Sequence, residues 1–406
     1  MFGAMTKSLQ SARRATFAYF ALNGFVLGLW VVHIPAIEHQ VGISHATLGW
    51  LLLLLGAGAF VGMQLVGPLT DRFGARRVVP LSAALCGASL ALPGLAGNAW
   101  TLGAALLVFG LGNGSLDVSM NAHAVQVEAG YRRPIMSAFH AVFSVGGVLA
   151  ALVGARALGW GWSTAATLST VGILAVAVGA AVAPALLPRS ESTGTAERSA
   201  TRTTTWRTTP LRIWALAGLA LMLMLTEGVA NDWSALALRD VLDAPAATAA
   251  LAYGAFATAM TVGRLLADRV AARFGPVAIV RYGSAVAAIA LTLVALAPSI
   301  PLAVTGWALF GLGLSGTVPQ LFSAAGHADP AAAGANVSRV AGLGYLGVLA
   351  GPAIIGPLTH LMPLNHTFFL PVAFCVAAAL SARILRPGAA QPQSQGDRPA
   401  AVDVHA

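Results

Sequence analysis

The sequence predicts an all-α polytopic membrane protein with twelve transmembrane helices in two pseudo-symmetric six-helix halves. Only 9% of the 406 residues are charged and 57% are hydrophobic, whereas a soluble domain carries about 25% charged residues. Apolar runs long enough to cross a bilayer as a helix, about 20 residues each, recur along the whole chain. These runs are continuous rather than alternating, which excludes a membrane β-barrel. Short motifs of the first half also return in the second.

Each predicted span is an apolar run bounded by charged residues, glycine or proline. Helices are the structure expected for such runs, because lipid offers no partner for backbone N–H and C=O groups. The twelve spans are predicted at residues 15–37, 46–69, 78–97, 101–124, 135–157, 163–187, 211–238, 247–267, 277–297, 301–324, 336–358 and 366–386.

Hydrophilic segments divide the chain after the sixth span and after the last. Residues 188–210 are rich in Ser, Thr and Arg, which is typical of a flexible connector. They separate an N-terminal half at 1–187 from a C-terminal half at 211–386. The tail at 387–406 is rich in Pro, Gln and Ala and is expected to be disordered.

The distribution of Lys and Arg predicts the orientation. With the N-terminus inside, 21 of the 23 Lys and Arg residues fall in cytoplasmic segments or at helix ends, Arg264 among them, and the exceptions are Arg156 and Arg239. The positive-inside rule expects such a bias. Both termini are therefore predicted to be cytoplasmic, in a bacterial inner membrane. The net charge of +9 is attributed to this orientation rather than to nucleic-acid binding.

An internal repeat supports the division into two halves. Three motifs return in the same order at offsets of 197 to 201 residues: Phe-Gly-Leu-Gly at 109–112 and 310–313, Gly-Val-Leu-Ala at 147–150 and 347–350, and Asp-Arg at 71–72 and 268–269. Two parallel six-span halves are an architecture of secondary transporters, which bind substrate between the halves near the midplane.

The loop between the second and third spans resembles that of a known family. Residues 67–77 read Gly-Pro-Leu-Thr-Asp-Arg-Phe-Gly-Ala-Arg-Arg, similar to the signature loop of the major facilitator superfamily, G-x-L-x-D-R-x-G-R-[RK]. The resemblance implies that Asp71 lies at the start of a helix of the other half, here near 336–339, where the helix dipole favours a carboxylate. The implied gating residues are Gly67, Asp71, Arg72, Gly74, Arg76 and Arg77, with Asp268 and Arg269 as less regular counterparts.

The fourth span resembles a particular branch of that family. Asp117 and Asn121 match the acid-x-x-x-Asn pattern of fucose permease-like sugar:proton symporters, and residues 133–140 are similar to an uncharacterised bacterial inner-membrane branch. Fucose permeases carry a second acid in the first span, four residues before a proline. Here Val31 stands at that distance from Pro35, so a two-acid proton relay does not carry over intact.

Polar residues inside the spans mark the candidate substrate and proton pathway. Asn113, Asp117 and Asn121 share one helix face at i, i+4 and i+8, and a carboxyl group is too costly to face lipid. That face is expected to line the bundle or the pore. The alternative is that these side chains only join helices by hydrogen bonds.

Further candidates come from the fifth, seventh and tenth spans. Glu227 and Asn231 share a face with Ser234, and Glu227 lies near the middle of its span, where a carboxyl group suits a proton carrier. His140 is expected to exchange protons or to bond a hydroxyl group, with a purely structural role equally open. Gln320 follows Pro319 and is expected to contact substrate beside a kink.

The sequence lacks the motifs of other function classes. It holds no Walker loop and no catalytic or metal-ligand cluster, so neither ATP-driven transport, enzymatic activity, a metal nor a cofactor is predicted. We expect a monomeric secondary transporter in the lipid bilayer, proton-coupled, whose substrate is a small polar solute such as a sugar. Two alternatives remain: proton-driven efflux of hydrophobic compounds, and a ligand sensor that does not transport.

Overall fold

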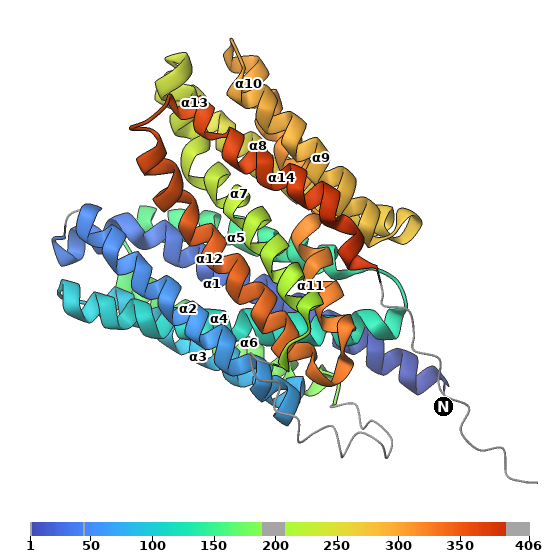
Figure 1. The fold of residues 1–406 in the computed structure, drawn as a ribbon. Helices are drawn as coiled ribbons and strands as arrows, with labels where there is room; N and C mark the ends of the chain where they lie inside the picture. The colour runs from blue at the N-terminus through green and yellow to red at the C-terminus, as the bar shows by residue number, and fades with distance from the viewer. Residues whose placement is uncertain (1, 44, 189–207, 387–406) are drawn as a thin grey trace, which may run out of the picture.

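The computed structural model describes residues 2–43, 45–188 and 208–386 (Figure 1). Every regular element in these ranges is helical. Most of the predicted connector at 188–210 and all of the predicted tail at 387–406 lie outside them.

Six helical stretches, some of them made of several consecutive elements, form each half of the molecule. The N-terminal half comprises α1 (Phe2–Val41), α2 (His45–Phe73), α3 (Ala75–Leu95), α4 (Ala99–Tyr131), α5 (Met136–Gly159) and α6 (Thr164–Val182) with the 3-10 turn η1 (Ala183–Ala185). The C-terminal half comprises α7 (Leu211–Leu242), α8 (Ala246–Phe274), α9 (Pro276–Ala295), α10 (Ile300–Leu314), α11 (Thr317–Ala328), η3 (Pro330–Ala332), α12 (Ala333–Leu358), α13 (Leu364–Thr367), α14 (Phe369–Ser381) and η4 (Ala382–Leu385).

The helix count confirms twelve spans. Within the described residues, eleven helical stretches are long and apolar enough to cross a membrane. Four of them combine several elements: α6 with η1, α10 with α11, η3 with α12, and α13 with α14 and η4. The remaining helix, α8, packs against α7 and α10 and completes the set.

Several helices run beyond the predicted spans. The first begins at Phe2 rather than residue 15, the fourth ends at Tyr131 rather than 124, and the eighth ends at Phe274 rather than 267. The predicted spans are shorter because apolar residues identify only the part of a helix that lies in lipid, whereas the helix itself continues into its polar ends. The tenth span is interrupted at Ser315 and Gly316, ahead of the kink expected at Pro319.

The repeated sequence motifs have repeated structural roles. A Cβ atom on Gly110 would collide with the Leu55 carbonyl oxygen, and one on Gly311 would collide with that of Phe256. These two glycines therefore let α4 approach α2 and α10 approach α8 in the same way. Gly74 and Gly275 occupy equivalent breaks, with φ of 81° and 82°, a conformation that favours glycine.

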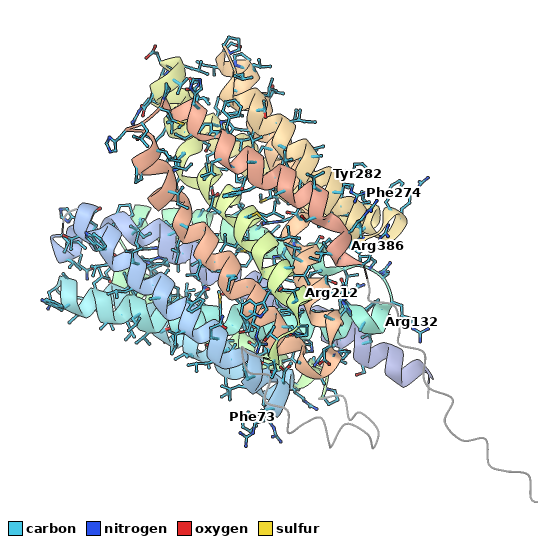
Figure 2. The ribbon with its side chains drawn as sticks, viewed as in Figure 1. Phe73, Arg132, Arg212, Phe274, Tyr282 and Arg386 are labelled. Carbon is cyan, nitrogen blue, oxygen red and sulfur yellow. The ribbon has the colours of Figure 1, made fainter. Side chains whose placement is uncertain are left out.

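The two halves meet at one end of the molecule and diverge towards the other (Figure 1). Contacts of α2 with α12, of α5 with α8, and of α11 with α4 and α5 join them. We call the end at which the halves meet the closed end. Figure 2 labels Phe73 and Phe274 near it, at the ends of α2 and α8.

Candidate functional site

The polar face of α4 is buried, as its spacing predicted. Asn113 and Asp117 are each 6% exposed and Asn121 is fully buried. Asn121 donates from Nδ2 to the backbone oxygen of Asp117 at 2.8 Å and to its carboxylate Oδ1 at 3.4 Å. The second Asp117 oxygen and Asn113 Oδ1 have no hydrogen-bond partner in the described part of the chain. Asp117 is thus a half-satisfied carboxyl group inside the bundle.

His140 continues the network from α4 to α5. Its Nε2 lies 3.2 Å from Asn121 Oδ1. Because Asn121 Nδ2 already donates to Asp117, Oδ1 accepts and Nε2 of His140 carries the proton. The imidazole packs against Phe20 of its own half and Phe322 of the other, with ring centroids 5.3 and 5.9 Å away. The histidine therefore lies where the two halves meet.

Arg264 of α8 joins this network to the C-terminal half. It donates from Nη1 to Ser144 Oγ at 2.8 Å, and the Ser144 hydroxyl donates to the His140 backbone oxygen at 3.2 Å. Arg264 Nη2 lies 3.4 Å from Glu227 Oε1 of α7. A polar path thus runs from Asp117 across the boundary between the halves to Glu227.

The position of Arg264 corrects the sequence prediction. The sequence assigns it to a cytoplasmic helix end, because the eighth span is predicted to stop at residue 267. In the structure α8 continues to Phe274, and the Arg264 side chain is only 14% exposed. An arginine at this depth is tolerated because Glu227 balances its charge.

Two predicted pathway residues stand apart from the network. Asn231 is exposed, and no hydrogen bond joins it to Glu227 or Ser234 in the described part of the chain. Gln320 is buried in α11, but its Nε2 has no hydrogen-bond partner among the described residues. Conversely, the Tyr345 hydroxyl of α12 lies within electrostatic range of both Asp117 and Glu227. Its sequence context, an apolar glycine-rich helix, carries no signal of that proximity.

The aspartate of the signature loop caps a helix of the opposite half. Asp71 accepts hydrogen bonds from the backbone N–H groups of Gly334 and Ala335, at 2.7 and 2.8 Å. The sequence predicts this helix start near 336–339, whereas α12 begins at Ala333, directly after the turn η3. Gly67 lies against Gly334 and Ser338, so that α2 and α12 approach closely.

The second half repeats this arrangement. Asp268 of α8 accepts from the N–H groups of Ser137 and Ala138 at the start of α5, at 2.9 and 2.7 Å. Each half therefore supplies one carboxylate to a helix start of the other, at the closed end. The arginines of the loop are all exposed, namely Arg72, Arg76 and Arg77 in the first half and Arg269 in the second.

Glu128 adds a further cross-half contact, which the sequence does not reveal. Its Oε2 accepts from the N–H groups of Ile135 and Met136 at 2.9 Å each. The other oxygen accepts from Ser323 Oγ of α11 and lies 3.8 Å from His327 Nδ1. The fourth span is predicted to end at residue 124, which leaves Glu128 in a loop. Its residue type gives no sign of this role.

Twelve membrane helices in two repeated halves, joined at one end by reciprocal helix caps and linked by a polar network, are the architecture of a membrane transporter. Comparison with known proteins names the family. The sequence model of the Major Facilitator Superfamily matches residues 15–352. The chain belongs to the major facilitator superfamily, whose members are transporters rather than enzymes.

One relative in sequence and two solved structures are consistent with this family. An uncharacterised transporter of Sinorhizobium fredii is 35% identical over 373 residues, covering 92% of this chain and 98% of its own length. The solved structure of FucP in the outward conformation has a TM-score of 0.74 at 15% identity, covering 92% of this chain and 98% of its own. A second structure, of a variant of the E. coli fucose:proton symporter FucP, has the same TM-score at 14% identity, over 92% and 98% of the two chains.

Proposed function

We propose that the chain is a proton-coupled secondary transporter of a small polar solute, such as a sugar, in the bacterial inner membrane. The polar network that links Asp117 to Glu227 across both halves carries this proposal. It brings together two carboxyl groups, an imidazole, an amide, a hydroxyl and a guanidinium group where the halves meet. Such a set offers donors and acceptors to a hydroxylated solute and exchangeable sites to a proton.

The proposed mechanism is rocking of the halves about this network. The excess of Lys and Arg at the closed end supports a cytoplasmic location for that end. A transporter that is closed on the cytoplasmic side and open on the other is in its outward-facing state. Asp71 and Asp268 hold that state by capping α12 and α5. Return to the inward-facing state requires these caps and the Ser144–Arg264 hydrogen bond to break. Asp117 and Glu227 are the proposed proton carriers, and the similarity in fold to the E. coli fucose:proton symporter supports proton coupling.

Solute flux in proteoliposomes tests the proposal. Purified protein is first screened by thermal shift against sugars, amino acids and hydrophobic drugs, and the strongest stabiliser is used as radiolabelled solute. We expect a sugar or other polar solute to accumulate when the exterior is acidic and to exchange without a gradient. Binding without counterflow would indicate a sensor instead, and accumulation of a drug in inside-out vesicles would indicate efflux.

A further inference from the structure

A groove on the outer face of the N-terminal half is separate from the polar network. It lies between α2 and α3, with Ser115 of α4 on its buried side, and has a volume of about 440 Å³. This volume falls within the range of about 300–1,000 Å³ that is typical of small-molecule sites. Its lining includes Leu69 and Phe73 of α2 with Arg77, Leu81 and Leu85 of α3.

The groove faces the membrane and is mainly apolar. Leu81 is 70% exposed, and Leu69, Phe73 and Leu85 are exposed as well. The groove follows α3 from Arg77 to Leu85, eight residues or about 12 Å at 1.5 Å per residue. The hydrocarbon core of a bilayer is about 30 Å thick, so the acyl chains of one leaflet span about 15 Å. The groove therefore has the length and lining to hold most of one acyl chain.

Positive charge gathers at one end of this groove. Arg77 lines it, and Arg76 and Arg72 lie within five residues of it on the chain. The nearby Asp71 directs both carboxylate oxygens to backbone N–H groups of α12. Among the described residues, the side chains of Arg76 and Arg77 have no hydrogen bond or ion pair. The charged end thus suits a phosphate group.

We propose that this groove binds one anionic phospholipid, with its phosphate at Arg77 and one acyl chain between α2 and α3. The site and the lipid class are argued from the groove and its charge alone. Placement of the lipid in the inner leaflet rests on the proposed function, in which the closed end faces the cytoplasm. The lipid would pack against α2, the helix whose Asp71 closes the two halves. Bound lipid is therefore expected to support the closed-end contact with α12.

Native mass spectrometry tests the site without reference to transport. The detergent-solubilised chain is titrated with phosphatidylglycerol and with phosphatidylethanolamine of the same acyl chains. Phosphatidylglycerol is expected to bind several-fold more tightly. Arg77→Ala should weaken its binding about fivefold, the effect of one surface charge on an anionic lipid, and Arg77→Glu should weaken it further. Leu85→Trp should weaken binding of both lipids because it fills the groove.

Arg281→Ala is the matched control, since α9 is the counterpart of α3 in the repeat and Arg281 lies near its start. Thermal unfolding and size-exclusion profiles check that each variant folds. Equal phosphatidylglycerol binding by the parent chain and Arg77→Glu would contradict the proposal. An equal loss of phosphatidylglycerol binding in Arg281→Ala would also contradict it, because the lipid would then respond to surface charge in general. A dimer of the chain that binds no lipid would contradict it as well, since a second copy would then cover the groove. Failure of solute transport would leave this result unaffected.

Discussion

At the scale of single residues, Asp117 is the clearest candidate for proton coupling. One carboxylate oxygen accepts from Asn121 and the other has no partner among the described residues. A buried carboxyl group with one unpaired oxygen has room to bind a proton there and to release it as its surroundings change. Replacement by the amide keeps the shape and removes the proton site.

We therefore predict that Asp117→Asn abolishes uphill accumulation driven by a pH gradient and retains solute counterflow. Exchange persists because it needs alternating access with solute bound, not net proton release. Both are measured in proteoliposomes. Asn113→Ala is the control, because it removes a polar group from the same helix face and keeps the carboxyl group. If Asp117→Asn accumulates solute with unchanged pH dependence, the proton site lies elsewhere, and Glu227→Gln is the next variant to measure.

The Arg264–Glu227 pair predicts a stability effect that depends on both partners. The pair is partly buried, with side chains 14% and 22% exposed. Removing one partner leaves the other charge poorly compensated, whereas replacing both partners is nearly neutral. Arg264→Gln should therefore lower the unfolding temperature strongly, and Arg264→Gln with Glu227→Gln should recover most of the loss. The measurement is thermal unfolding in detergent.

The exposed pair Arg239–Asp240 provides the control for this experiment. Its side chains are 57% and 47% exposed, so solvent screens their interaction. Arg239→Gln should leave the unfolding temperature unchanged. Equal effects of Arg264→Gln and Arg239→Gln would show that the central pair has no special role in stability.

Sequence reasoning found part of this residue network. It identified Asp117, Asn121, His140 and Glu227, because polar side chains are rare and conspicuous inside apolar spans. It missed Arg264, because arginines near a predicted helix end are indistinguishable from orientation determinants. Partners such as Ser144 and Arg264 are 120 residues apart, and only the packing of the halves reveals their contact.

At the scale of helices, the two reciprocal caps are expected to differ in strength. Asp71 alone caps the first N–H groups of α12 with a side chain of the other half, whereas the start of α5 holds Asp268 and also Glu128. Hydrogen bonds to a charged group contribute about 1.5–3 kcal/mol, which is about 10- to 150-fold in an equilibrium constant. Asp71→Asn should slow transport about tenfold or more, and Asp268→Asn should slow it less.

Transport rates and solute binding are measured together for these two variants. Solute binding should remain near the parental level in both, because neither carboxylate hydrogen-bonds a side chain of the polar network among the described residues. The control is Asp240→Asn, which removes an exposed carboxylate that pairs with Arg239 and caps neither α5 nor α12. A parental transport rate in Asp71→Asn would remove the gating role from this loop.

The helices were also the level at which the sequence was most informative. Apolar length identified each span, and the signature loop identified the break at Gly74. The break at Ser315 and Gly316 was not predicted, because glycine is frequent throughout the chain and does not mark a break by itself. The kink was instead expected beside Pro319. Pro319 is the third residue of α11, where its missing N–H is not needed.

At the scale of the whole molecule, the Lys and Arg distribution predicts which end faces the cytoplasm. Cysteines at Gly194 and Gly388, which lie outside the described residues, should resist impermeant thiol reagents in intact cells. Gly97→Cys, in the connection between α3 and α4 where nothing crowds the glycine, should react. The native Cys86 and Cys375 are buried and give a low background. Labelling of either Gly194→Cys or Gly388→Cys from outside would overturn the orientation.

The two-half architecture was predictable because the motifs repeat, whereas the conformation was not. A repeat specifies that the halves are related, but the same sequence must support contact at either end during transport. The closed-end caps and the cross-half bond of Glu128 to Ser323 select the arrangement seen here. The Asp71 cap was expected from the resemblance of its loop to that of the family, whereas the bond of Glu128 to Ser323 does not follow from composition or spacing.

The central claim, proton-coupled transport of a polar solute, is tested most directly by substrate-induced proton movement. Proteoliposomes in weak buffer and without an imposed gradient receive the solute identified by thermal shift, and the external pH is recorded. Symport predicts that the exterior becomes more alkaline as protons enter with the solute, and that Asp117→Asn abolishes this change while counterflow continues. Solute entry with no pH change in the parent protein would contradict the account.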